Sequence, residues 1–151
     1  MTIGSGVTSI NSSAFQNANN IERLKLNYKN INSTFSNKTS LTSLTFGNNV
    51  EIIGGSAFYG CTRLTDVIIP NSVTSIGSSA FSSCTALESV TIGNSVTEIN
   101  DSAFYNCTSL TEVIIPDSVE YIRGSAFSGC SNLINVNIGS GVIEAPYTIF
   151  S

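Results

Sequence analysis

Residues 84–104 read CTALESVTIGNSVTEINDSAF, and the same apolar pattern returns along almost the whole chain. Within this stretch, Val90 and Ile92 alternate with polar residues, which predicts a short β-strand. A polar turn follows, and then a second apolar pair, Val96 and Ile99. A unit this short cannot enclose a core of its own, so its apolar side chains must pack against the units before and after it.

The spacing of the phenylalanines defines the repeat. The tripeptide Ser-Ala-Phe ends at Phe15, Phe58, Phe81, Phe104 and Phe127, and Phe35 and Phe150 occupy the remaining positions. Every interval is 23 residues except the first, which is 20. Equivalent side chains should therefore stack, and the short strands should form a parallel sheet with about 4.8 Å between coils. We expect one mainly β solenoid domain over residues 1–151, a curved stack of about six and a half 23-residue coils. The parallel sheet should cover one face, and short strands or helical turns should cover the other.

Two segments depart from the repeat. The coil over residues 16–35 is three residues short, and Asn27-Tyr28-Lys29-Asn30 stands where other coils have the turn and the second apolar pair. We expect an irregular, tight loop there. Near the end, residues 145–148 (Ala-Pro-Tyr-Thr) replace the regular pattern, and the proline cannot donate a backbone hydrogen bond, which is typical of a rudimentary stop.

The chain opens and stops in mid-coil. Both ends of the stack should then present apolar residues and unpaired strand edges, which isolated solenoids normally cover with polar caps. The pattern predicts either a fragment of a longer array or association end to end.

A finer alternation has a period of two coils. Gly47, Gly93 and Gly139 follow the strand in one set of coils, and Pro70 and Pro116 follow it in the other. The residue between the two apolar strand positions alternates as well: Thr45, Ile68, Thr91, Ile114 and Asn137. The simplest account is growth by duplication of a two-coil unit.

The motif in residues 84–104, repeated along essentially the whole chain, closely resembles the BspA-like, Treponema pallidum-type leucine-rich repeat. The resemblance implies a leucine-rich-repeat solenoid of a kind found on surface and secreted proteins of bacteria and some parasitic protists. It also implies a role in adhesion and protein binding, with a host matrix or cell-surface protein as the partner.

Composition excludes several other functions. The chain has no His, which rules out mechanisms built on an imidazole base and His-ligated zinc. A net charge of −4 disfavours binding to nucleic acid. Apolar runs such as Val67–Ile69 are too short to insert into a membrane, and the first residues do not form a signal peptide. We expect no cofactor and no metal site.

Four cysteines, Cys61, Cys84, Cys107 and Cys130, recur every 23 residues. This spacing matches no zinc motif. Stacked coils would bring neighbouring Cα atoms within the range of a disulfide, but parallel side-chain directions favour a ladder of free, buried thiols over disulfides.

Asp66 and Glu112 are the candidate acid and base of an enzyme. They occupy equivalent strand positions two coils apart, with about 10 Å between their backbones, a separation that overlaps that of inverting glycosidases. Any repeat with acids at one position would place them so, and neither a deep cleft nor an aromatic sugar platform is indicated. We expect no enzymatic activity.

Binding through the strand face is the favoured function, because stacked strands present side chains at fixed intervals. The candidate binding residues point outward from the strands: Arg23, Lys25, Thr45, Asp66, Ile68, Thr91, Glu112, Ile114, Asn135 and Asn137. The leading hypothesis is a non-enzymatic binding module of a cell-surface or secreted protein. An intracellular scaffold of the same fold and, less favoured, a carbohydrate-active protein are the alternatives.

Overall fold

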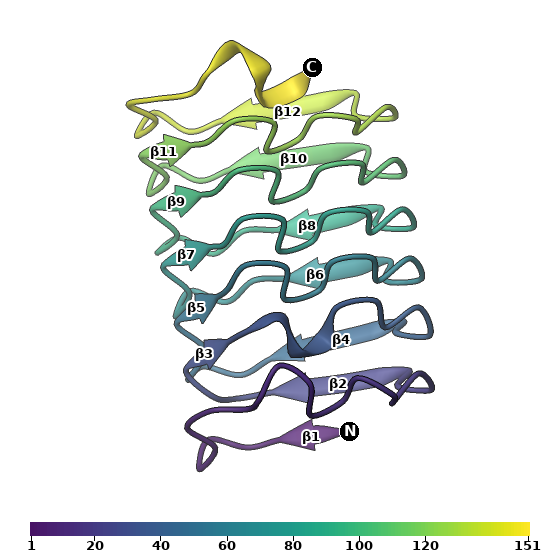
Figure 1. Cartoon of the computed structure of the whole chain (residues 1–151). Coiled ribbons are helices and arrows are strands. Elements are labelled where there is room, and N and C mark those ends of the chain that lie inside the picture. The colour runs from purple at the N-terminus through teal and green to yellow at the C-terminus, as the bar shows by residue number, and fades with distance from the viewer.

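The computed structural model describes all residues from 1 to 151, and the whole chain forms one continuous stack of coils (Figure 1). From β2 to β11, each coil runs through a strand of three or four residues, a turn, a two-residue strand and a turn-rich return segment. The longer strands are β2 (Arg23–Leu26), β4 (Ser43–Phe46), β6 (Asp66–Ile68), β8 (Ser89–Thr91), β10 (Glu112–Ile115) and β12 (Asn135–Ile138), and the two-residue strand β1 (Thr2–Ile3) holds the same position in the first coil. The short strands are β3 (Asn30–Ile31), β5 (Ile52–Ile53), β7 (Ser75–Ile76), β9 (Glu98–Ile99) and β11 (Tyr121–Ile122).

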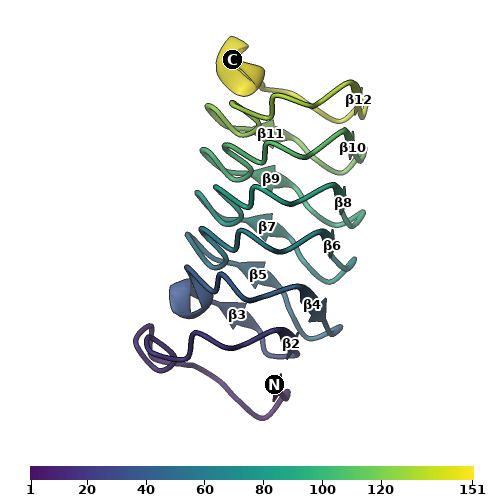
Figure 2. The same ribbon diagram turned by 90° about the vertical axis from the view of Figure 1, so that its right-hand side faces the viewer.

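All strand pairing is parallel and in register with the repeat. The short strands form one continuous five-stranded sheet, in the order β11-β9-β7-β5-β3. The longer strands and β1 form two sheets, β1-β2-β4 and β12-β10-β8-β6, along the other side of the stack (Figure 2). Ile68 pairs with Thr91, and Thr91 pairs with Ile114, so equivalent residues lie directly above one another. The predicted mainly β solenoid is confirmed.

The Ser-Ala-Phe segments form the third side of each coil. The expected helical turn is found only as two short 3-10 helices, η1 (Ser33–Phe35) and η2 (Tyr147–Phe150), whereas the regular coils use hydrogen-bonded turns. Ser102 and Asn106 flank Phe104 with positive φ, and the Phe104 N–H donates to the Ala126 carbonyl at 2.8 Å. Two left-handed residues per coil reverse the chain too sharply for a helix. The chain contains no helix with the length and apolar character that a membrane crossing requires.

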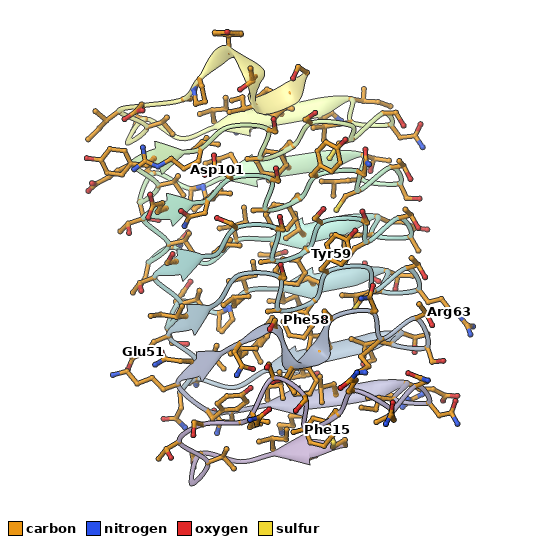
Figure 3. All side chains as sticks on the ribbon, viewed as in Figure 1. Phe15, Glu51, Phe58, Tyr59, Arg63 and Asp101 are labelled. Carbon is orange, nitrogen blue, oxygen red and sulfur yellow. The ribbon has the colours of Figure 1, made fainter.

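The core is a set of stacked ladders. Neighbouring phenylalanine rings from Phe15 to Phe150 stack with centroid separations of 5.2 to 6.0 Å (Figure 3, where Phe15 and Phe58 are labelled). The four cysteines are free and buried, as predicted. Each thiol donates to the carbonyl of a phenylalanine in the preceding coil, as Cys84 does to Phe58 at 3.3 Å. The repeat therefore forms a continuous apolar core in which each coil packs against the coils before and after it.

The short coil keeps its second apolar pair, contrary to the sequence-based expectation. Ile31 pairs with Ile53, and Tyr28, three residues earlier, lies where Val50 lies in the next coil. Tyr28 and Ile31 are each only 1% exposed. The missing residues are taken from the turn after β2 and from the approach to η1, because the chain can shorten its polar corners without opening the core.

At the C-terminal end of the stack the last longer strand is exposed at all four positions, with Val136 at 42% and Ile138 at 44%. The expected stop near Pro146 is the short helix η2, which places Phe150 on Phe127 at 5.7 Å. Association end to end through such surfaces stays a prediction, which light scattering at high protein concentration would test.

Candidate binding surface on the strand face

The strand face comprises the outward side chains of β2, β4, β6, β8, β10 and β12. All ten residues expected to bind a partner are exposed: Arg23, Lys25, Thr45, Asp66, Ile68, Thr91, Glu112, Ile114, Asn135 and Asn137. Ile68 is 69% exposed and Ile114 is 55% exposed, although both are large apolar side chains. The alternating pattern of β2 to β10 buries one set of residues in the core and turns the other set out to solvent, whereas β12, at the end of the stack, is exposed at every position.

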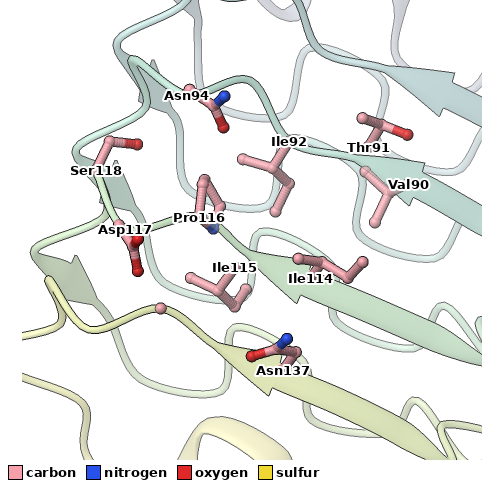
Figure 4. A pocket seen from close by; sticks show the side chains of 11 residues that line it. Val90, Thr91, Ile92, Asn94, Ile114, Ile115, Pro116, Asp117, Ser118 and Asn137 are labelled. Carbon is pink, nitrogen blue, oxygen red and sulfur yellow. The ribbon is translucent and has the colours of Figure 1, made fainter.

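Two grooves cross the strand face, one at each proline-containing coil. We call them the Pro70 groove, about 340 Å³, and the Pro116 groove, about 670 Å³ (Figure 4 shows the latter). The Pro70 groove lies between β4 and β6 and is lined by Thr42, Ser43, Leu44, Thr45, Phe46, Asp66, Ile68 and Pro70. The Pro116 groove includes side chains of Thr91, Ile92, Ile114, Pro116, Asp117 and Asn137.

A missing backbone hydrogen bond accompanies each groove, although it is not confined to the proline coils, because the Gly93 N–H forms no backbone hydrogen bond either. In a glycine-containing coil the Gly139 N–H donates to the Ile115 carbonyl of the preceding coil at 2.8 Å. Pro70 and Pro116 hold the equivalent position but carry no N–H, so the hydrogen bond cannot form there. The two coils are therefore not joined at the end of the strand, and solvent can enter between them.

The junction at Pro70 is the more open in its backbone. No strand pairing joins β4 to β6, so the sheet of longer strands is divided there, while the sheet of short strands continues past it. β4 is also the strand that ends in Phe46, where the following four coils carry Ile. The Phe46 ring packs edge-on against Phe58 with 5.7 Å between centroids. We attribute the missing pairing to this larger side chain together with the absent proline N–H.

The structure gathers the expected binding residues into groups. Thr45, Asp66 and Ile68 line the Pro70 groove. Thr91, Ile114 and Asn137 line the Pro116 groove. Arg23 and Lys25 lie with Met1, Thr2 and Thr45 at a third, shallow hollow of about 240 Å³, and Glu112 and Asn135 line none of these three.

Sequence reasoning did not select Pro70, Pro116, Phe46 or Asp117 as lining residues. A signal was present for the two prolines, since their alternation with glycine marks the coils that lack a backbone donor.

Asp66 and Glu112 lie on either side of Ser89, since each pairs with it in the sheet. Ser89 Oγ donates to an Asp66 carboxylate oxygen at 2.6 Å, and this hydrogen bond, with one from Thr65, lowers the pKa of Asp66. A general acid needs a raised pKa, so the shift opposes the acid role in glycoside hydrolysis. Neither carboxylate forms a salt bridge.

The thiols of the cysteine ladder differ in pKa, because burial raises the pKa of the inner thiols while a hydrogen bond with Cys107 lowers the pKa of Cys130. Burial raises the pKa of Cys61 to about 11, and burial also raises the pKa of Cys84. A thiol that holds its proton is a poor nucleophile and a poor metal ligand. No cluster of three or more His, Cys, Asp or Glu side chains could hold a metal ion.

The stacked parallel strands, the phenylalanine ladder and the exposed strand face define a leucine-rich-repeat solenoid. The particular family follows from a match to the model of the BspA type leucine rich repeat region, in six copies over residues 1–34 and 29–151. The chain belongs to this family.

Several solved structures are similar to the chain. The T. pallidum leucine rich repeat protein aligns with a TM-score of 0.84 and 26% identity, over 97% of this chain and 77% of that one. A leucine rich cell surface protein from Faecalibacterium prausnitzii aligns with a TM-score of 0.63 and 31% identity, over 89% of this chain and 46% of that one. A leucine-rich repeat protein from Bacteroides capillosus aligns with a TM-score of 0.52 and 35% identity, over 59% of this chain and 63% of that one. No curated protein matches the chain.

Proposed function

We propose that this chain is a non-enzymatic binding module that recognises a protein partner, such as a host matrix or cell-surface protein, through its strand face. The observation that supports this most directly is the pair of exposed isoleucines, Ile68 and Ile114, each beside a groove. Exposed apolar side chains amid small polar ones are typical of protein interaction sites. Burial of either side chain against a partner would favour binding by about 1 to 2 kcal/mol.

A paired set of variants tests this function. Binding to a panel of purified extracellular-matrix and cell-surface proteins is measured by surface plasmon resonance. We expect the double variant Ile68→Ser, Ile114→Ser to lose most of the binding that the unmodified chain shows. Ile52→Ser is the matched control, since Ile52 is 40% exposed but lies on the opposite sheet, in β5.

The proposal fails if the double variant binds as tightly as the unmodified chain, or if Ile52→Ser causes the same loss. Circular dichroism of each variant checks that the fold is kept, as expected for substitutions at exposed positions.

We further propose a cell-surface or secreted location. The support is family membership and the similarity to a cell surface protein of F. prausnitzii. Antibodies against the chain should label intact cells of the source organism, and protease added outside the cells should remove the signal. Labelling only after lysis would favour the intracellular scaffold instead.

A further inference from the structure

We propose that the strand face binds a basic segment in the polyproline II conformation, which lies along the solenoid axis and places every third residue at one of the two proline grooves. This inference rests on the binding function proposed above and names the class of partner.

The spacing of the apolar residues carries the inference. Ile68 and Ile114 both pair with Thr91, one from each side, so they lie two coils apart at the same position. Two coils of a parallel sheet span about 9.6 Å. A polyproline II helix has three residues per turn and rises 3.1 Å per residue, so equivalent side chains repeat about every 9.3 Å. The repeat of the ligand and the repeat of the surface therefore agree to within a few tenths of an ångström.

Other peptide conformations match this surface less well. Side chains on one face of an extended strand repeat at about 6.7 Å, which fits neither one coil nor two. On an α-helix, residues seven apart lie about 10.5 Å from each other, and the helix is about 10 Å wide. A body of that width would rest on top of the two isoleucines, and its repeat differs from the two-coil spacing by about 0.9 Å.

The polar residues that alternate with the isoleucines complement a polyproline II backbone. Thr91 lies between Ile68 and Ile114, Asn137 lies beyond Ile114, and Thr45 holds the equivalent position of the repeat before Ile68. All three lie at the grooves. A polyproline II chain has no internal hydrogen bonds, and its carbonyls remain free to accept. If one side chain of the ligand contacts Ile68 and another contacts Ile114, the ligand's backbone carbonyls between them can accept hydrogen bonds from the Thr91 side chain.

The charges beside the two isoleucines are acidic and favour a basic ligand there, whereas the cationic residues of the strand face, Arg23 and Lys25, lie on β2 near the N-terminal end of the stack. Asp66 and Glu112 stand two residues before Ile68 and Ile114 on the same strands, and they share the two-coil spacing. Neither carboxylate has a cationic partner in the structure, and the pKa of Asp66 is lowered by its hydrogen bond from Ser89. A Lys or Arg in each triplet of the ligand would lie beside one of these carboxylates.

The test is fluorescence anisotropy with a labelled peptide of repeated Pro-Pro-Lys triplets, long enough to cross both grooves. The control peptide has the same composition with all its lysines at one end. We expect the triplet peptide to bind at least about fivefold more tightly than the control, and Ile68→Ser or Ile114→Ser to weaken its binding by about fivefold each. Added salt should weaken the binding, because the carboxylates are exposed.

A register variant provides the sharpest control. Thr91→Ile combined with Ile114→Thr keeps the composition of the strand face but brings the two isoleucines to neighbouring coils, about 4.8 Å apart. We expect this variant to lose the preference for the triplet peptide, while Ile52→Ser on the opposite sheet keeps it.

Equal binding of the triplet and control peptides would overturn the inference, and so would an unchanged preference in the register variant. Tighter binding of a basic α-helical peptide with apolar residues seven apart would also overturn it. If the strand face binds a protein in the panel described above but no triplet peptide, the proposed function stands and this inference fails. If the chain binds neither a protein of the panel nor the triplet peptide, the proposed function and this inference are both refuted.

Discussion

Tyr28 provides the sharpest test of the packing, because its hydroxyl is buried without a partner. The side chain is 1% exposed, and its Oη has no hydrogen bond in the structure. An unsatisfied buried polar group costs about 1 to 3 kcal/mol. Tyr28→Phe removes this group and keeps the ring, so we expect the variant to be more stable than the unmodified chain by about that amount at neutral pH.

The effect should grow at high pH. Burial raises the pKa of Tyr28 from 10.0 to about 12. Above pH 10 the unfolded chain loses the tyrosine proton while the folded chain retains it, so rising pH favours unfolding until the folded chain also ionises near pH 12. A shift of this size corresponds to at most about 2.7 kcal/mol. The stability advantage of Tyr28→Phe should therefore widen between pH 10 and pH 12.

Urea unfolding followed by circular dichroism, at neutral and alkaline pH, measures both quantities. Tyr59→Phe is the matched control, because Tyr59 is 40% exposed and its hydroxyl can be hydrated (Figure 3). The thiols titrate in both proteins and cancel in the comparison. If Tyr28→Phe is no more stable than the unmodified chain, or if its advantage stays constant with pH, then Tyr28 does not occupy the core as described.

Three further predictions concern the ladders and the acids. Phe104→Ala should destabilise the fold by about 3 to 5 kcal/mol, because Phe104 is fully buried and stacks on a ring at each side. Phe150→Ala at the exposed end of the ladder should destabilise it by no more than about 2 kcal/mol. Equal losses of stability in denaturant unfolding would contradict the ladder. A thiol reagent added to the native protein should react first with Cys130, which is 9% exposed while the other three cysteines are fully buried, and mass spectrometry of the modified peptides should show this order. The double variant Asp66→Asn, Glu112→Gln should match the unmodified chain in a screen for glycan cleavage, and activity that only the unmodified chain shows would restore the carbohydrate-active alternative.

The short coil shows where prediction from the sequence met its limit. Counting residues located the shortening correctly over 16–35 but placed the whole loss in one loop. The repeat predicts Val at the position of Tyr28, so the sequence pattern places Tyr28 in the loop. The fold accepts tyrosine at the Val position because the apolar ring fills the space, at the cost of the buried hydroxyl.

Lys38 was also missed as a core residue. It stands three residues after Phe35, where later coils carry cysteine, and it is only 2% exposed. Its Nζ donates to the Phe15 carbonyl at 2.7 Å, just as each thiol donates to a phenylalanine carbonyl. Sequence alone would place a lysine on the surface, whereas the structure shows that the carbonyl at this point of the coil accepts a hydrogen bond from an ammonium in place of a thiol.

The amino-acid sequence by itself determined the solenoid, the ladder of phenylalanines and the set of side chains that point outward, and it favoured free cysteines over disulfides. These features follow from the repeat, because identical units of fixed length can only stack in register. Only the tertiary structure decided that the sheet of longer strands divides between β4 and β6 and that grooves open at Pro70 and Pro116. We attribute the gap between β4 and β6 to the packing of Phe46 on Phe58 and to the backbone N–H that Pro70 lacks. Both effects act between neighbouring coils, so they arise only once the coils are stacked.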